Sequence, residues 1–199
     1  MKLSKKGEYA LRSLINLGIA AEVGRPLVQA SALAESERLP GKFLEQILQE
    51  LKEAELIGSR RGKFGGFHLA KPARQITIGS VVRLIDGPLA PIGCVSQTAY
   101  EKCSCPDETH CGLRMLMLDV RNAIAGILDR YTLADVVEVT LRKMRRDNVP
   151  LPIAAVADRN TPARSLPSRT AIEAAGRDRR ARLSETEGVV HQLLGDYSI

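Results

Sequence analysis

Apolar residues recur at helical spacing in the first part of the chain and divide it into three segments. The first segment follows Ser4, which can cap a helix, and has apolar residues three or four positions apart. Residues 28–36 form a shorter helical segment, and the sequence ERLP separates it from a third segment that Pro40 opens. Two short helices joined by a tight turn predict a helix-turn-helix.

The third segment has two distinct faces. Its apolar face consists of Phe43, Leu44, Ile47, Leu48 and Leu51. Its polar face consists of Lys42, Glu45, Gln46 and Gln49. This division predicts an amphipathic helix that packs on a core and leaves its polar face in solvent.

Two strand-like runs, residues 56–60 and 66–70, follow and enclose a glycine-rich tip. This hairpin contains Arg60, Arg61 and Lys63. A basic hairpin directly after a helix-turn-helix is typical of a wing, whose cations contact DNA phosphates or enter the minor groove. The alternative is an ordinary hairpin with solvated cations.

All four cysteines lie close together after a further amphipathic helix predicted over residues 76–86. They are Cys94, Cys103, Cys105 and Cys111, in the polar segment CVSQTAYEKCSCPDETHC, which we expect to be a loop. A chain of 199 residues with 44% hydrophobic residues can build a core without disulfides. Clustered thiols without an export signal indicate metal binding or reactivity, and the spacing alone excludes neither an iron–sulfur cluster nor zinc.

A heptad pattern follows the cysteines. Its members are Leu113, Met117, Val120, Ile124, Ile127 and Tyr131. This seam predicts a long helix that forms a homodimer, with packing inside one chain as the alternative. A two-fold protein would suit a palindromic DNA site.

The chain carries a formal net charge of +6, which favours polyanionic partners. No apolar run is long enough for a membrane span, and Glu8, Arg12 and Asn16 interrupt the one stretch that could pass for a signal peptide. We therefore expect a cytoplasmic protein that does not act at a membrane. An enzyme using the thiols would leave the helix-turn-helix and basic wing unexplained, so we expect no catalytic residues.

Three parts of the sequence together resemble the Rrf2-type winged-helix regulators, which include IscR-like and NsrR-like iron–sulfur sensors. They are MKLSKKGEYALRSL at the start, FLEQILQELKEAELIGSRRGKFGGFHLAK in the middle, and the clustered cysteines before a long helix. The resemblance covers residues 1 to about 145. It implies a homodimeric transcription factor, usually a repressor, that binds double-stranded DNA at a palindromic operator.

The resemblance also implies an iron–sulfur cluster held by Cys94, Cys105 and Cys111, with 2Fe–2S favoured over 4Fe–4S. Ten residues separate Cys94 from Cys105, more than is usual in the family, and Cys103 is an additional thiol. The histidine that IscR-like members place after the last cysteine is replaced by Arg114.

For the fourth ligand, the resemblance implies Glu8 of the partner subunit, with Cys103 and His110 as local alternatives. It also implies base contacts from Glu45 and Gln46 and a wing contact from Arg61. A DNA-binding regulator controlled by zinc, thiol oxidation or a partner protein, without an iron–sulfur cluster, stays open as an alternative.

These observations predict a mainly α fold in four parts. Residues 1–90 form the winged helix-turn-helix domain, and residues 91–112 form the cysteine loop. Residues 113–146 contain the dimerisation helix and the helix after it. Residues 147–199 form a flexible tail rich in proline and arginine, with a possible amphipathic stretch over 184–194.

Overall fold

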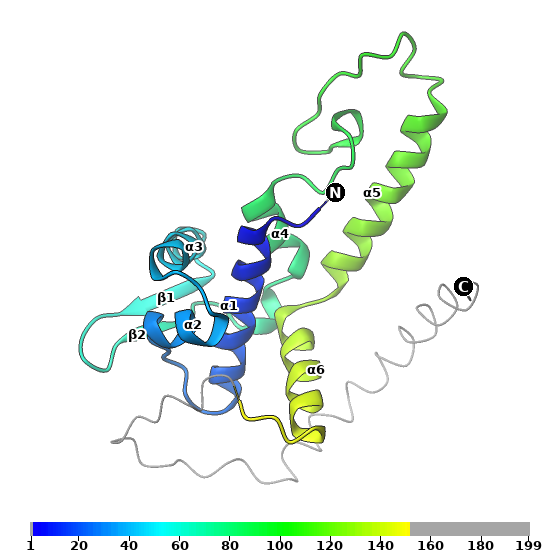
Figure 1. Ribbon diagram of the computed structural model, residues 1–199. Coiled ribbons are helices and arrows are strands. Elements are labelled where there is room, and N and C mark those ends of the chain that lie inside the picture. The colour runs from blue at the N-terminus through cyan, green and yellow to red at the C-terminus, as the bar shows by residue number, and fades with distance from the viewer. Residues whose placement is uncertain (1, 152–199) are drawn as a thin grey trace. The chain divides into compact units, whose positions relative to one another are not determined.

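The computed structural model describes residues 2–151, which form a mainly helical unit with one two-stranded sheet (Figure 1). The elements in chain order are α1 (Lys5–Glu22), α2 (Ala30–Glu37), α3 (Gly41–Glu53), β1 (Ile57–Arg60), β2 (Gly66–Leu69), the short 3₁₀ helix η1 (Ala73–Gln75), α4 (Ile78–Asp86), the 3₁₀ helix η2 (Gly93–Val95), α5 (Gly112–Arg130) and α6 (Leu133–Arg146). The predicted fold class, a winged helix-turn-helix with a long following helix, is confirmed.

Helix α1 lies at the centre of the core. Ser4 caps it as predicted, since the Ser4 hydroxyl accepts a hydrogen bond from the Gly7 N–H at 2.9 Å. Leu14 and Leu17 are fully buried against the surrounding helices. The same core includes Leu133 of α6, so the last described helix packs on the helix-turn-helix unit.

The helix-turn-helix starts later than the pattern predicted. Helix α2 begins at Ala30, because Val28 forms an antiparallel bridge with Phe67 of the wing. Arg38 ends α2 in the left-handed conformation, with φ of 53°, and this residue turns the chain into α3. Helix α3 then follows Pro40, which occupies the cap position.

The wing is an antiparallel hairpin. Its register pairs Ile57 with Leu69 and Arg60 with Gly66. Each strand is one residue shorter than predicted, because Leu56 and Ala70 only flank the ladder. The bridge between Val28 and Phe67 joins the hairpin to the start of α2.

Helix α4 connects α1 to α5 through two polar contacts. Asp86, at its end, accepts hydrogen bonds from the backbone N–H and the hydroxyl of Ser4. Arg83 forms a two-pronged ion pair with Asp129 of α5, at 2.7 and 2.6 Å. The helix starts at Ile78, two residues later than predicted.

Within residues 2–151, no helix combines the length and apolarity that a bilayer crossing requires. The predicted stretch 184–194 and most of the predicted tail lie outside the described residues. The four-part domain division stays a prediction.

Candidate DNA interface and cysteine loop

The polar face of α3 lies in solvent, as the amphipathic pattern predicted. Lys42, Glu45 and Gln46 are all exposed, while Leu44 and Ile47 are fully buried on the other side of the helix. This arrangement leaves an amide, a carboxylate and an ammonium on one accessible helix, and such groups can hydrogen-bond to base edges or phosphates in a major groove.

The wing presents its cations beside the start of α2. Arg60, Arg61 and Lys63 are exposed, and a hollow of about 360 Å³ lies between the tip half of the wing and Gln29. Arg60 and Arg61 line this hollow. A concave surface lined by guanidinium groups and glycine backbone suits an anionic group such as a DNA phosphate.

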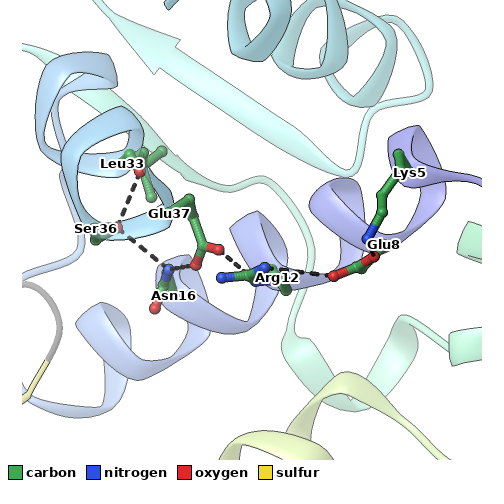
Figure 2. Close-up of polar contacts among 7 residues, drawn as sticks. All are labelled: Lys5, Glu8, Arg12, Asn16, Leu33, Ser36 and Glu37. Atoms are coloured by element: carbon green, nitrogen blue, oxygen red, sulfur yellow. Dashed lines mark hydrogen bonds and ion pairs between the residues drawn. The ribbon is translucent and has the colours of Figure 1, made fainter. Parts of the chain in front are cut away.

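A buried polar network holds α2 against α1 (Figure 2). The Glu37 carboxylate is nearly buried, with 7% of its side chain exposed, and lies 2.5 Å from Nε of Arg12. The Asn16 amide donates to the same carboxylate. The network was not predicted from the sequence. Its one sequence signal was Asn16, a polar residue among the mostly apolar buried positions of α1.

Glu8, the predicted fourth ligand, belongs to the exposed end of the same network (Figure 2). Its carboxylate lies 2.7 Å from Lys5 Nζ and 3.4 Å from Arg12 Nη1. The hydrogen bond from Lys5 is the main reason that the pKa of Glu8 is lowered. Glu8 is therefore an anion already paired with two cations of its own chain.

The four cysteines are free thiols in the loop between α4 and α5. The Glu101 N–H donates to the Gly93 carbonyl at 3.2 Å, which folds the loop back toward η2. The Cys105 N–H donates to Cys103 Sγ at 3.4 Å. The thiols of Cys94 and Cys103, of Cys103 and Cys105, and of Cys105 and Cys111 lie close enough to shift one another's pKa. The structure thus brings successive pairs of the four predicted thiols near one another.

The thiols differ in their protonation. Burial is the main cause that raises the pKa of Cys94, which is 5% exposed. The hydrogen bond with Cys105 lowers the pKa of Cys103, and the same contact raises the pKa of Cys105 to about 11. Cys103 is therefore the thiol of this pair that loses its proton more readily.

A network of neutral and charged groups surrounds these thiols. The Tyr100 hydroxyl donates to the Glu108 carboxylate at 2.7 Å, and Arg114 Nε lies 3.1 Å from the same carboxylate. The Glu108 charge acts on both Cys94 and Cys103. Glu108 was not identified in the sequence, where it is one of several acidic loop residues.

Cys111 and His110 are placed differently at the end of the loop. Cys111 caps α5, and its sulfur accepts the Arg114 N–H at 3.5 Å. His110 is exposed and lies 2.6 Å from Asp107, whose pKa is lowered mainly by that contact. Among residues 2–151, no three Cys, His, Asp or Glu side chains converge in a metal-binding geometry. The series of soft thiols fits an iron–sulfur cluster or zinc by donor chemistry, and binding either would require the loop to tighten.

The predicted heptad seam on α5 divides into two groups. Leu113, Val120 and Ile127 are exposed, by 59%, 36% and 52%, whereas Met117, Ile124 and Tyr131 are half-buried within the chain. Leu116, which the seam omitted, is 53% exposed. The spacing of Leu113, Leu116, Val120 and Ile127 places them on one helix face.

A helix-turn-helix followed by a basic wing defines a winged-helix transcriptional regulator that binds DNA. The chain belongs to the Rrf2 family, described as iron-dependent transcriptional regulators, whose model matches residues 3–139.

Comparisons with individual proteins agree with this assignment. The chain is 36% identical over 135 residues to an HTH-type transcriptional regulator of Rhodobacter capsulatus described as rrf2-like, covering 67% of this chain and 90% of the relative. The solved structure of CymR, the global cysteine regulator of B. subtilis, matches with a TM-score of 0.59 and 29% identity, covering 70% of this chain and 98% of CymR. IscR of T. potens matches with a TM-score of 0.54 and 26% identity, covering 70% of this chain and 88% of that structure.

Proposed function

We propose that this protein is a homodimeric transcriptional repressor whose binding to a palindromic operator is controlled by an iron–sulfur cluster in the cysteine loop. The observation that carries the proposal is the clustering of four free thiols in the one loop between α4 and α5. Both flanking helices connect by polar contacts to the helix-turn-helix unit or to each other.

In the DNA complex, α3 enters the major groove and the wing follows the adjacent backbone. Glu45 accepts a hydrogen bond from a cytosine amino group, and Gln46 pairs with adenine. Lys42, Arg60 and Lys63 contact phosphates, and Arg61 contacts a phosphate or the minor groove. The exposure of these side chains supports the assignment.

The second protomer packs on the exposed apolar stripe of α5. Leu113, Leu116, Val120 and Ile127 lie on the same helix face, where the described residues of the chain leave them open to solvent. An apolar stripe at this spacing is typical of a helix that pairs with a second copy of itself. Met117, Ile124 and Tyr131 contribute at the edge of the interface and to packing within the chain.

Cys94, Cys105 and Cys111 would hold the cluster, with Cys103 or the partner's Glu8 as the fourth ligand. The iron-dependent description of the family supports this assignment. When bound, an iron–sulfur cluster supplies a site whose charge and integrity respond to redox state, nitric oxide and iron supply. We favour a 2Fe–2S form.

The chain itself offers a path from the loop to the DNA-binding elements. The loop follows α4, whose Asp86 binds Ser4 at the start of α1. Arg12, two turns further along α1, holds Glu37 at the end of α2. A change in the position of α4 therefore acts on the helix-turn-helix through α1, as a shift between two arrangements of the dimer.

The experiment that tests the proposal is anaerobic purification followed by absorption spectroscopy, with iron, zinc and acid-labile sulfide measured on one sample. We expect visible charge-transfer bands with stoichiometric iron and sulfide. Serine variants of the four cysteines, together with Glu8→Gln, would then identify the ligands by loss of colour and iron. Cys103→Ser that keeps full iron would assign the fourth position to Glu8 or another group.

A second candidate is control by thiol oxidation without a cluster. The proximity of Cys103 and Cys105, whose contact lowers the pKa of Cys103, favours it over a metal-free protein with inert cysteines. Protein that stays colourless after reconstitution, contains no zinc and loses operator binding after peroxide treatment would support this candidate.

A further inference from the structure

Phe64 is a large apolar side chain at the tip of the wing, and 60% of it is exposed. Among residues 2–90, the exposed large hydrophobic side chains are Leu3, Phe64 and Leu84, so Phe64 is the only aromatic ring of this group. Phe64 is not part of the hydrophobic core or of the partly buried side chains packed against it. The phenyl ring at the end of the hairpin is therefore available to contact a partner, and its large flat apolar surface suits stacking or insertion.

The turn that carries Phe64 is tightly closed. Gly62 has φ of +113°, and the Gly65 N–H donates to the Gly62 carbonyl at 2.9 Å. A Cβ atom on Gly65 would lie 2.1 Å from the Arg60 carbonyl oxygen, so this position tolerates only glycine. The four-residue tip therefore projects Phe64 from a fixed backbone.

The tip is also attached to the helix-turn-helix. Gln29, which precedes α2, donates from its side-chain amide to the Lys63 carbonyl at 3.3 Å. The Val28 backbone pairs with Phe67 at 2.8 and 3.0 Å. Because of these contacts, the position of Phe64 is set relative to α2 and α3, and the tip approaches DNA whenever α3 enters a major groove.

The charge around Phe64 indicates what kind of surface the ring meets. Arg60, Arg61 and Lys63 are exposed around it, and Lys63 Nζ lies 5.8 Å from the centre of the Phe64 ring. Three cations at one hairpin tip favour a polyanion as the binding partner. An apolar protein surface is disfavoured, because binding to it would remove water from these charges without providing opposite charges.

We propose that Phe64 is an apolar wedge that enters the minor groove at the edge of the operator, partly unstacks one base step and bends the DNA. This inference rests on the DNA interface described above and adds a specificity determinant to it. Apolar side chains inserted between base pairs kink DNA by about 20–90°, and flexible pyrimidine–purine steps yield most easily. The wedge thus selects a deformable step at the position that the wing tip reaches.

The test uses full-length protein and an operator duplex selected by the wild-type protein from random-sequence DNA. The end-to-end bend is measured by energy transfer between terminal dyes, and unstacking is measured by 2-aminopurine fluorescence at the step next to the wing. Phe64→Ala is expected to weaken binding about ten-fold and to abolish both signals, with an unchanged salt dependence, because no charge is removed. Phe64→Leu, which keeps an apolar wedge, is expected to retain most of the bend.

Two further variants separate the wedge from electrostatic binding. Phe64→Lys adds a cation, so it is expected to steepen the salt dependence while still losing the bend. Arg61→Ala is the matched control, and it is expected to weaken binding and reduce the salt slope by about one while keeping the bend. All four variants change exposed side chains, and thermal unfolding verifies that each is folded.

An unchanged bend and affinity in Phe64→Ala, together with weaker binding of Arg61→Ala, would overturn the wedge and leave the DNA interface standing. If neither variant alters binding, the wing assignment itself fails. Binding of wild-type protein to vesicles of phosphatidylcholine and phosphatidylglycerol that Phe64→Ala abolishes, with DNA binding unaffected, would overturn the wedge in favour of a membrane contact.

Discussion

Removal of the Arg12 guanidinium tests the buried contact between α1 and α2. We choose Arg12→Met, because methionine keeps a long apolar side chain while it removes the guanidinium, which pairs with Glu37 and whose Cζ lies 5.5 Å from the centre of the Tyr9 ring. The Glu37 side chain is 7% exposed in the wild type. In the variant its carboxylate keeps only the hydrogen bond from Asn16. A buried charge that loses its partner destabilises the folded state.

The structure sets the magnitude. Loss of one partner of a fully buried ion pair costs about 3–5 kcal/mol. The Arg12 side chain is 44% exposed, so water already screens part of the attraction, and the Asn16 amide remains. We therefore expect a loss of about 2 kcal/mol in the free energy of unfolding, which corresponds to a decrease in Tm of about 4–8 °C for a unit of this size.

Thermal and urea unfolding of the full-length protein measure this effect. Arg146→Met is the matched control, because it removes the guanidinium of an exposed ion pair with Asp147 and should change the free energy of unfolding far less. Adding Glu37→Gln to Arg12→Met removes the buried charge and should restore about 1 kcal/mol. An Arg12→Met protein as stable as the wild type would show that the network does not hold α2 in place.

Two other predictions concern α5. Ile127→Asp places a charge on the exposed apolar stripe and should make the protein monomeric at micromolar concentration in analytical ultracentrifugation. Met115→Asp is the control, because Met115 lies on another face of the helix, and this variant should remain a dimer. Equal behaviour of the two variants would refute the stripe as the interface. The hydrogen bond from Arg83 lowers the pKa of Asp129 below its usual 3.8. The pair therefore contributes stability above the unfolded pKa and loses it as the pH falls through the lower folded value. The difference in unfolding free energy between wild type and Asp129→Asn, about 0.5–1 kcal/mol at pH 6, should shrink toward zero below pH 3.8, and a difference constant with pH would contradict the assignment.

Local signals in the sequence predicted the helix-turn-helix and the wing. Ser4 is a helix cap in the structure, and the two faces of α3 are buried and exposed as its pattern required. These features depend on residues three or four positions apart, so the sequence alone contains them.

Features that depend on distant residues were not predicted. Val28 pairs with Phe67 instead of starting α2, because the wing offers it a strand partner that no nearby residue could reveal. The Arg12 and Glu37 contact joins residues on separate helices. Similarly, the heptad pattern on α5 did not show which apolar residues face the chain and which face solvent.

The cysteine loop was predicted in composition but not in arrangement. The clustering of four thiols is visible in the sequence. Which thiols lie next to each other depends on how the loop folds back on η2. The role of Glu108 depends on the same fold, because the ion pair with Arg114 and the hydrogen bond from Tyr100 place its charge near Cys94 and Cys103.

The most direct test of cluster-controlled DNA binding is the operator affinity of one anaerobic preparation, measured before and after the iron is removed by a chelator and again after reconstitution, at fixed salt. We predict that affinity for the selected operator changes at least ten-fold when iron and sulfide are lost, and that reconstitution reverses the change. The same affinity in all three samples, with nonspecific DNA as the reference, would contradict the account.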